Sequence, residues 1–429
     1  MSPIPVTRRE LAVSVARATA TLAFPAIVPA SVLGAEAPSK RVALAHIGVG
    51  SRGGGLLDGF RGLPECRVVA VSDCYRSRCE GHARATDAAY GSTGCKAYAD
   101  FRDLCADPAI DAVVVATPDH WHVPAALEAI RHGKHVYVEK PLGVSIEQDL
   151  VLRDAVRRYG VVFQYGTQQR SMPHMRWACE MVRSGKLGKL RAVEITCPAN
   201  VQGGSTTPAT PPADLDYEMY LGPAPVTPYT VDRCTSLGSY HIFDFAVGFI
   251  GGWGAHPLDI MLWGLGDGPD AVPVEYAGSA TWPSAGLFDT PLTWDVRGRF
   301  ADGKRFRFTA PGSDMTIFIG DRGRIEVGRG GFGRIEPASL RDVKPRPGDL
   351  RLTVSDNHGA NFIEAIRSGA PAVTSADSAC WSDLVSHLSD ISLRTGRTIR
   401  WDPSKAAIVG DPAAARLQHR PMRAPWRLK

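Results

Sequence analysis

The chain has 429 residues, a hydrophobic content of 44% and a formal net charge of +5. This length and apolar content suffice for two ordinary domains with their own cores. The charges are dispersed along the chain, which does not indicate a nucleic-acid partner. The nine cysteines are odd in number and show no Cys-x-x-Cys or Cys/His spacing. We therefore expect no metal site and mostly buried thiols, with one or two disulfides left open.

Residues 1–37 have the features of an export signal. Thr7-Arg8-Arg9-Glu10-Leu11 is a twin-arginine pattern, a weakly apolar, alanine-rich stretch follows, and Ala35-Glu36-Ala37 offers a cleavage site. Arg17 and two prolines argue against a membrane span, which needs about 20 apolar residues. We expect a twin-arginine signal peptide and a periplasmic or otherwise exported protein; an ordinary basic N-terminus is the alternative. This route carries folded proteins, so a cofactor can be loaded before export.

Residues 41–73 contain a dinucleotide-binding pattern. An apolar strand, Val42–Ile47, leads into a G-x-G-x-x-G motif, a helical stretch follows, and a second strand, Val68–Val71, precedes an acid. The glycines permit a tight turn, a close approach of the backbone to the pyrophosphate, and close packing of helix on strand. The start of the helix offers free N–H groups to phosphates. The candidate cofactor-binding residues here are Gly48, Gly50, Ser51, Arg52, Gly53 and Asp73.

Asp73 also bears on the choice of cofactor. A carboxylate at this position accepts hydrogen bonds from the adenosine ribose and repels a 2′-phosphate, which favours NAD. Arg76 and Arg78 follow at the start of the next helix and leave NADP open as the alternative.

The next elements lead to a second candidate loop. We expect helices over 77–90 and 100–106 and a buried strand over 112–116, whose continuous apolar run is typical of a parallel sheet. Ligands gather at the carboxyl ends of such strands, so the following Thr-Pro-Asp-His-Trp-His loop should face the nicotinamide half of the cofactor. The candidates in this loop are Thr117, Pro118, His120 and His122. For the two histidines, helix capping or surface packing is the alternative.

The last elements of the first domain carry another motif. A helix over 124–132 and a strand over 135–138 lead to Glu139-Lys140-Pro141, and a helix over 145–159 precedes a strand over 161–165. The alternation of strands and helices predicts a doubly wound parallel α/β domain, which we place at residues 40–167.

Three motifs together resemble one family. G-V-G-S-R-G, T-P-D-H-W-H and E-K-P-L are similar to segments of the Gfo/Idh/MocA oxidoreductases, named for glucose-fructose oxidoreductase and inositol dehydrogenase. The resemblance continues through Gly248–Asp259 to the closing segment Arg420–Trp426, and that last segment is similar to an exported branch. It implies a Rossmann domain followed, over residues 168–429, by an α/β domain with a large, open, mostly antiparallel sheet. It also implies a homodimer or homotetramer.

The sequence of the second half agrees with that implication. Turn signals separate five expected strands, at 190–197, 275–282, 292–300, 305–310 and 315–320. Two helices, over 361–368 and 376–395, end at glycines. Residues 201–228, rich in Pro, Gly and Thr, are expected to form a long loop on the substrate or oligomer side.

The resemblance also assigns catalytic candidates. Lys140 and Glu139 of the E-K-P segment should lie beside the nicotinamide, where Lys140 can hold the reacting oxygen or shuttle its proton. His256 matches the family histidine and is the candidate general base, because imidazole titrates near working pH. Asp259 could orient His256 or bind a hydroxyl. Gly252 stands where better-known inositol dehydrogenases carry an aspartate, which leaves the usual Asp–His relay in question.

Three functions remain open at this point. The first is an exported NAD(P)-dependent oxidoreductase with tightly bound cofactor, acting on a ring carbinol of a sugar, sugar derivative or cyclitol. The second is a glycosidase that uses NAD catalytically through transient oxidation of the sugar. The third is a non-catalytic carbohydrate-binding protein, which the presence of both Lys140 and His256 disfavours.

Overall fold

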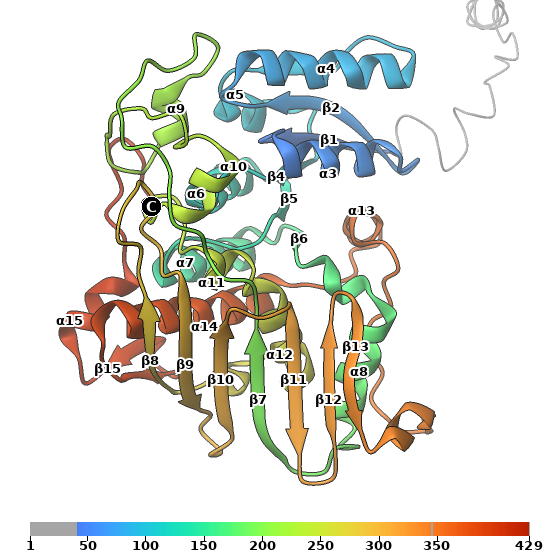
Figure 1. Ribbon diagram of the computed structural model, residues 1–429. Helices are drawn as coiled ribbons and strands as arrows, with labels where there is room; N and C mark the ends of the chain where they lie inside the picture. The colour runs from blue at the N-terminus through green and yellow to red at the C-terminus, as the bar shows by residue number, and fades with distance from the viewer. Residues whose placement is uncertain (1–40, 345, 429) are drawn as a thin grey trace, which may run out of the picture. The chain divides into compact units, whose positions relative to one another are not determined.

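The computed structural model describes residues 41–344 and 346–428 (Figure 1). Residues 42–429 form one compact unit. The predicted signal peptide, residues 1–37, lies outside the described residues. Within the described ranges, no helix is both long and apolar enough to cross a membrane. The cysteines from Cys74 to Cys380 are free thiols, so the disulfides left open by the sequence do not form among them.

A parallel six-stranded sheet carries the first half of the chain. Its strand order is β3-β2-β1-β4-β5-β6, and every neighbouring pair is parallel. The order reverses between β1 and β4, which makes their carboxyl ends the expected ligand site. The strands are β1 Val42–Ile47, β2 Cys66–Ser72, β3 Lys96–Tyr98, β4 Ala112–Val115, β5 His135–Val138 and β6 Phe163–Tyr165.

Helices connect these strands as the sequence predicts, with one difference. They are α3 Ser51–Arg61, α4 Arg76–Tyr90, α5 Phe101–Ala106, α6 Asp119–Arg131 and α7 Ile146–Tyr159. Ser145 caps α7 by accepting a hydrogen bond from the Gln148 N–H, and Gly160 ends it in the left-handed conformation. The difference is α6, which begins at Asp119 rather than near Pro124 and therefore takes His120 and His122 into a helix.

A nine-stranded sheet carries the second half. Its order is β13-β12-β11-β7-β10-β9-β8-β14-β15, and within it only β7 and β10 pair in parallel. This confirms the expected large, mostly antiparallel sheet and adds β12 to β15, which the sequence did not reveal. The strands are β7 Leu190–Thr196, β8 Glu275–Thr281, β9 Thr293–Arg299, β10 Arg305–Ala310, β11 Met315–Gly320, β12 Arg324–Gly328, β13 Gly331–Glu336, β14 Ile399–Asp402 and β15 Ala407–Val409.

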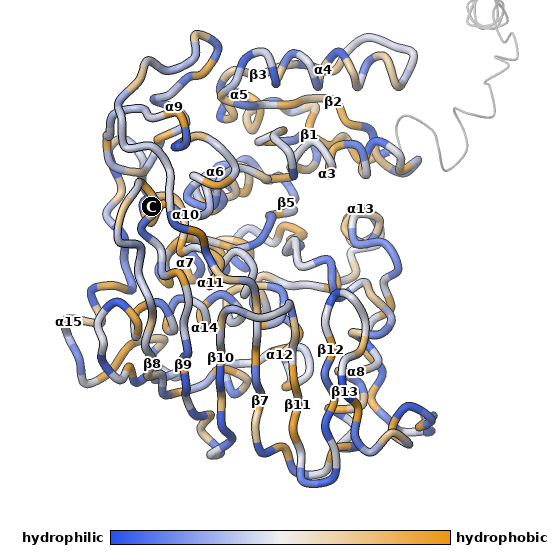
Figure 2. Tube along the Cα trace, viewed as in Figure 1, coloured by the Kyte–Doolittle hydropathy of each residue, from blue (hydrophilic) through white to orange (hydrophobic). Residues whose placement is uncertain are grey.

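One face of the nine-stranded sheet is covered by helices. The helices are α8 Pro173–Arg183, α12 Ala255–Leu265 and α14 Ala376–Thr395, which contact β12, β11 and β8 respectively (Figure 1). Burial accordingly alternates along β9 and β10, whereas β1 and β4 are buried almost throughout. Figure 2 shows the corresponding hydropathy along the chain. The pattern is that of a sheet with one packed face beside a sheet covered on both faces.

Late segments of the chain return to the six-stranded sheet. Helix α13, His358–Ser368, packs Phe362 and Ile363 into the core beside β1. The closing segment brings Trp426 edge-on to Trp121, with ring centroids 4.6 Å apart. These contacts fix late segments of the chain against the domain of the six-stranded sheet.

Candidate active site

The glycine motif forms a tight cradle between β1 and α3. Gly48 adopts φ +82°, and a Cβ there would lie 2.7 Å from the Ala116 carbonyl oxygen. A Cβ on Gly53 would collide with the Gly48 carbonyl, so Gly53 permits the close packing of α3 on β1. The backbone N–H groups that begin α3 have no acidic side chain among them in the first turn. The cradle therefore suits an anionic ligand such as a pyrophosphate.

A cavity of about 520 Å³ opens in front of this cradle. Its walls come from the carboxyl ends of β1, β2 and β4 and from the helix α10, Ser236–His241. Of the residues predicted from the sequence, Gly48, Gly50, Ser51, Arg52, Asp73, Thr117 and Pro118 line it. Its position at the switch point of the sheet and its size suit a dinucleotide.

Asp73 has a structural task in addition to its place in the cavity wall. Its two carboxylate oxygens accept hydrogen bonds from the N–H groups of Val49 and Tyr75, both at 2.9 Å. The Arg78 guanidinium lies 3.5 Å from the same carboxylate and lines the cavity near Gly50. Arg78 is therefore the arginine placed to meet a phosphate, while Arg76 does not line this cavity.

His120 and His122 do not line this cavity, contrary to the role expected for them. Both are 1% exposed, and their rings bond to backbone carbonyls: His120 Nε2 to Tyr220 at 2.9 Å, and His122 Nδ1 to Pro141 at 2.6 Å. Burial lowers the pKa of His120 to about 4, so the ring is neutral at working pH. The early start of α6 explains the difference, because a helix turns these side chains into the core. They support the walls of the site.

The E-K-P segment places Glu139 and Lys140 beside two residues of the cavity wall, Arg52 and Tyr240. Glu139, 3% exposed, binds the Arg52 guanidinium at 2.6 and 2.8 Å. Lys140 Nζ donates a hydrogen bond to the Gly252 carbonyl at 3.0 Å. Burial lowers the pKa of Lys140, while the nearby carboxylates of Glu139 and Asp119 oppose that effect. Lys140 is thus a half-buried cation whose pKa is lowered toward the range useful for proton transfer.

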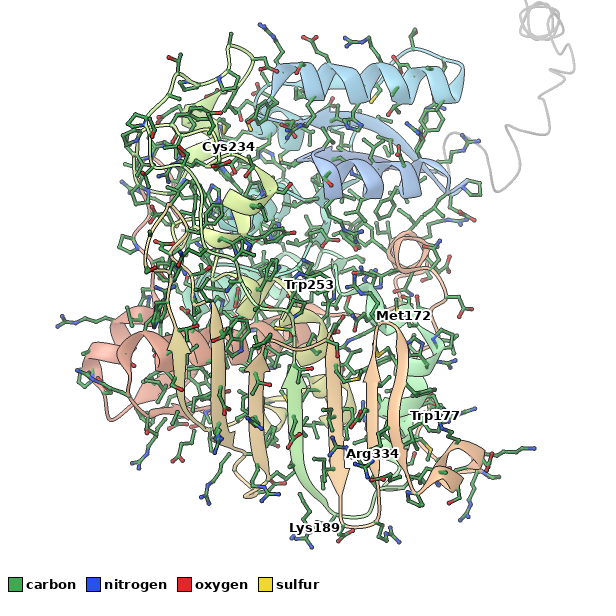
Figure 3. The ribbon with its side chains drawn as sticks, in the orientation of Figure 1. Met172, Trp177, Lys189, Cys234, Trp253 and Arg334 are labelled. Atoms are coloured by element: carbon green, nitrogen blue, oxygen red, sulfur yellow. The ribbon has the colours of Figure 1, made fainter. Side chains whose placement is uncertain are left out.

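His256 lies near Lys140 at the start of α12. It is 2% exposed, and its Nδ1 has no hydrogen-bond partner among the described residues. Burial, with the charges of Lys140 and Arg329 close by, lowers the pKa of His256 well below the ordinary value. The ring is therefore neutral at working pH. Trp253, which precedes it, lies near the end of the nine-stranded sheet (Figure 3), with its ring centroid 6.1 Å from that of His256.

Asp259 has a different partner from the one expected. Arg170, 2% exposed, binds its two oxygens at 2.6 and 2.8 Å and also binds Asp267 at 2.7 and 2.8 Å. The carboxylate is fully buried in this ion pair. Asp259 therefore joins α12 to the segment after β6, and both of its carboxylate oxygens bind Arg170.

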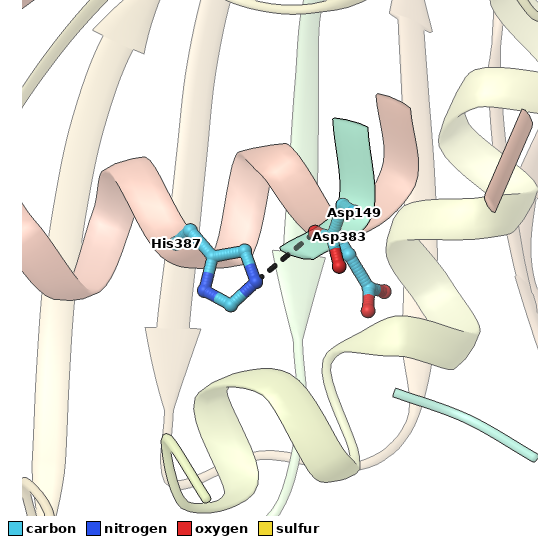
Figure 4. Close-up of side chains that lie close together, drawn as sticks. All are labelled: Asp149, Asp383 and His387. Carbon is cyan, nitrogen blue, oxygen red and sulfur yellow. Dashed lines mark ion pairs between the residues drawn. The ribbon is translucent and has the colours of Figure 1, made fainter. Parts of the chain in front are cut away.

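A buried polar cluster lies beneath the E-K-P turn (Figure 4). Asp383 on α14 accepts hydrogen bonds from the Leu142 N–H and the Tyr165 hydroxyl. Asp149 on α7 lies 3.1 Å from His387 Nε2, and both side chains are almost fully buried. Burial raises the pKa of Asp383 to about 7 and lowers that of His387 to about 4. The cluster anchors the residues that follow Lys140.

Two further side chains belong to the cavity wall. Asp119 is 3% exposed, and one of its carboxylate oxygens has no partner among the described residues. Tyr240, on α10, lines the same cavity. Asp119 stood inside the T-P-D-H-W-H motif, so its position was a usable signal. The place of Tyr240 shortly before the Gly248–Asp259 segment was only a weak sequence signal that it lines the pocket.

Two family models match this chain. Residues 44–167 match the Gfo/Idh/MocA model described as an oxidoreductase family with an NAD-binding Rossmann fold. Residues 200–428 match the model of that family's C-terminal alpha/beta domain.

Individual relatives match shorter stretches. The scyllo-inositol 2-dehydrogenase (NAD(+)) of Bacillus subtilis is 30% identical over 154 residues, 36% of this chain and 41% of that protein. A glycosyl hydrolase family 109 protein of Saccharopolyspora erythraea is 38% identical over 112 residues, 25% of this chain and 24% of that protein. The chain thus spans less than half the length of these curated relatives.

The fold also matches solved structures. A levoglucosan dehydrogenase in complex with NADH and levoglucosan superimposes with a TM-score of 0.60 at 18% identity, covering 84% of this chain and 99% of that chain. With the cradle, the cavity and both family models in agreement, the chain belongs to the Gfo/Idh/MocA oxidoreductase family, whose Rossmann fold binds NAD.

Proposed function

We propose that this chain transfers a hydride between NAD and a ring carbinol of a sugar, sugar derivative or cyclitol. One observation carries the proposal. Lys140, which follows β5 of the six-stranded sheet, donates its hydrogen bond to Gly252, four residues before His256. A half-buried cation and a neutral imidazole from two separate parts of the fold thereby come together behind Tyr240, a residue of the cavity wall.

The site residues divide the work of oxidation. When bound, NAD⁺ accepts the hydride that leaves the carbinol carbon. Neutral His256 takes the hydroxyl proton, and the Lys140 ammonium stabilises the negative charge that develops on the oxygen. The products are a keto sugar, a reduced cofactor and a protonated imidazole, so atoms and charge balance.

The cradle residues hold the cofactor in this proposal. The N–H groups after Gly48 and Gly50 face the pyrophosphate, Arg78 lies beside it, and Asp73 faces the adenosine ribose. The Asp73 carboxylate supports NAD over NADP, although Arg78 beside it leaves NADP as the alternative.

Export and assembly belong to the same proposal. The twin-arginine pattern of residues 7–11 supports a periplasmic or otherwise exported protein. Outside the cytoplasm there is no nicotinamide pool to exchange with, so the cofactor would be tightly held and regenerated in place by a second sugar. We further propose a homodimer or homotetramer, as the family resemblance implies.

A second candidate function is cleavage of a glycoside without net oxidation. Relatives named glycosyl hydrolase family 109 proteins favour it, and five of them align with 31% to 39% identity. Transient oxidation would acidify the neighbouring C–H, and the glycosidic bond would break by elimination with release of the aglycone alcohol. Water would then add to the resulting double bond, and the hydride would return to the ketone. This cycle also needs no external cofactor pool.

The test uses the purified mature protein. Denaturation and mass spectrometry identify any released nicotinamide, and the native enzyme is offered a panel of free sugars, cyclitols and aryl glycosides. Reduction of bound cofactor by one free sugar and reoxidation by a second supports the oxidoreductase. Release of the aryl alcohol with no net change in the cofactor supports the glycosidase. A protein that neither holds nor takes up NAD contradicts both.

A further inference from the structure

Tyr240 lines the cofactor cavity and also contacts Lys140. It belongs to α10, which closes the cavity wall together with Thr235 and Ser236. The Lys140 Nζ lies 5.5 Å from the centroid of the Tyr240 ring. This distance is within the range in which an ammonium is attracted to an aromatic face.

Gly252 makes room for this ring. A Cβ at position 252 would come within 3.3 Å of Tyr240 Cδ1 and 3.5 Å of Cε1, so the ring packs directly on the glycine backbone. The carbonyl of the same glycine accepts the hydrogen bond from Lys140. The Phe249 ring braces Tyr240 from another side, with centroids 5.8 Å apart and planes at 66°. Packing therefore fixes the ring relative to the ammonium.

The hydroxyl at the end of this ring is unengaged. No residue of the described chain hydrogen-bonds it, and Tyr240 is half-buried. Burial raises the pKa of Tyr240, the carboxylates of Asp119 and Glu139 add to that effect, and Arg52 opposes it. The phenol therefore keeps its proton and is a hydrogen-bond donor, not an acceptor of the substrate's proton.

We propose that Tyr240 is a catalytic residue of the oxidoreductase: its hydroxyl donates a hydrogen bond to the oxygen on the carbon that loses the hydride. This rests on the function proposed above. The carbon–hydrogen bond breaks toward the nicotinamide, the hydroxyl proton passes to His256, and the carbonyl that forms is held by Lys140 and Tyr240. Tyr240 exchanges no proton and no electrons. Its ring additionally holds the Lys140 ammonium in place.

Two substitutions separate the hydroxyl from the ring. Tyr240→Phe keeps the ring over Lys140 and removes the donor, so kcat/KM for the sugar should fall about 10²-fold, as for loss of one donor to a developing oxyanion. The affinity for NAD, measured by fluorescence titration, should not change. Tyr240→Leu removes the ring as well, so the pH–rate profile should in addition shift to lower pH as Lys140 loses a contact that favours its charge.

Tyr217→Phe is the matched control. Its hydroxyl donates to the Thr227 carbonyl outside the cavity, so activity should match wild type. A Tyr240→Phe variant with wild-type kcat/KM, or one in which only NAD affinity falls, overturns the proposal and leaves the oxidoreductase function standing. A wild-type protein that binds NAD but reduces it with no sugar or cyclitol overturns the proposed function instead, and this role of Tyr240 falls with it.

Discussion

The buried ion pair between Arg170 and Asp259 allows a clear test of whether Asp259 acts in stability or in catalysis. Arg170 is 2% exposed and donates two hydrogen bonds to the Asp259 carboxylate. In the Asp259→Asn variant the same guanidinium faces a neutral amide. Breaking a buried pair in this way costs about 3–5 kcal/mol, a large part of the 5–15 kcal/mol that stabilises a typical domain. Asp267 binds the other edge of Arg170 and retains part of the compensation. We therefore expect the lower end of that range.

The assay compares stability and turnover in the same preparations. Urea unfolding should show the loss of stability, while kcat per folded, cofactor-loaded enzyme stays near wild type. Asp267→Asn is the matched control: Asp267 is 28% exposed, so its loss should cost about 1 kcal/mol or less. The double variant Arg170→Met/Asp259→Leu replaces both charges by apolar groups and should recover much of the stability. An Asp259→Asn enzyme of normal stability with kcat reduced by orders of magnitude would refute this account and restore Asp259 as a catalytic residue.

Three further predictions concern the cofactor, the lysine and acid stability. Gly53→Ala forces a Cβ onto the Gly48 carbonyl and should abolish tight NAD binding in a fluorescence titration, whereas Gly59→Ala, on the same helix with open space around it, should not. Lys140→Met should lower kcat by about 10²–10⁴-fold while bound NAD, quantified after denaturation, stays stoichiometric; normal turnover would remove Lys140 from the mechanism. His120 has a folded-state pKa of about 4, below its ordinary value of about 6.5, so the unfolded chain binds more protons and stability falls as the pH drops through this window. His120→Phe should flatten the urea-derived stability profile there by up to one proton, and an unchanged slope would count against a buried neutral His120.

Much of the secondary structure could be predicted from local sequence signals. The strand Val42–Ile47 was predicted with its observed bounds, because an apolar run stops at Gly48, whose positive φ other residues rarely adopt. Helix α14 was likewise predicted over Ala376–Thr395, since Ser375 caps its start and Gly396 ends it in the left-handed conformation.

Tertiary contacts decided what sequence reasoning missed. Pro124 suggested a helix start, yet α6 begins at Asp119, where His120 and Trp121 bond to backbone carbonyls of α9, Tyr217–Leu221. Strands β12 to β15 were not predicted, although Asp321-Arg322-Gly323 is the turn between β11 and β12, because their residues show no apolar run or alternation as clear as in the strands before them.

The candidate site divides in the same way. Gly48, Gly50 and Asp73 lie in the cavity wall, because each follows a buried strand and strand ends collect at one edge of a parallel sheet. The partner of Asp259 was not found, because Arg170 lies 89 residues before it and no motif links the two. Because that partner was unknown, we expected Asp259 to orient His256. Tyr240 was only a weak pocket candidate in the sequence, since its contacts with Lys140 and Gly252 exist only in the folded chain.

The most direct test of the central claim follows the hydride itself. The NAD-loaded protein is mixed with the sugar or cyclitol that reduces it, deuterated at the carbinol carbon, and the released cofactor is weighed by mass spectrometry. If the Lys140–His256 end of the cavity performs hydride transfer, one deuterium appears on the reduced nicotinamide, and Lys140→Met abolishes the transfer. Deuterium that stays on the sugar or is lost to solvent, with the cofactor unlabelled, would contradict the account.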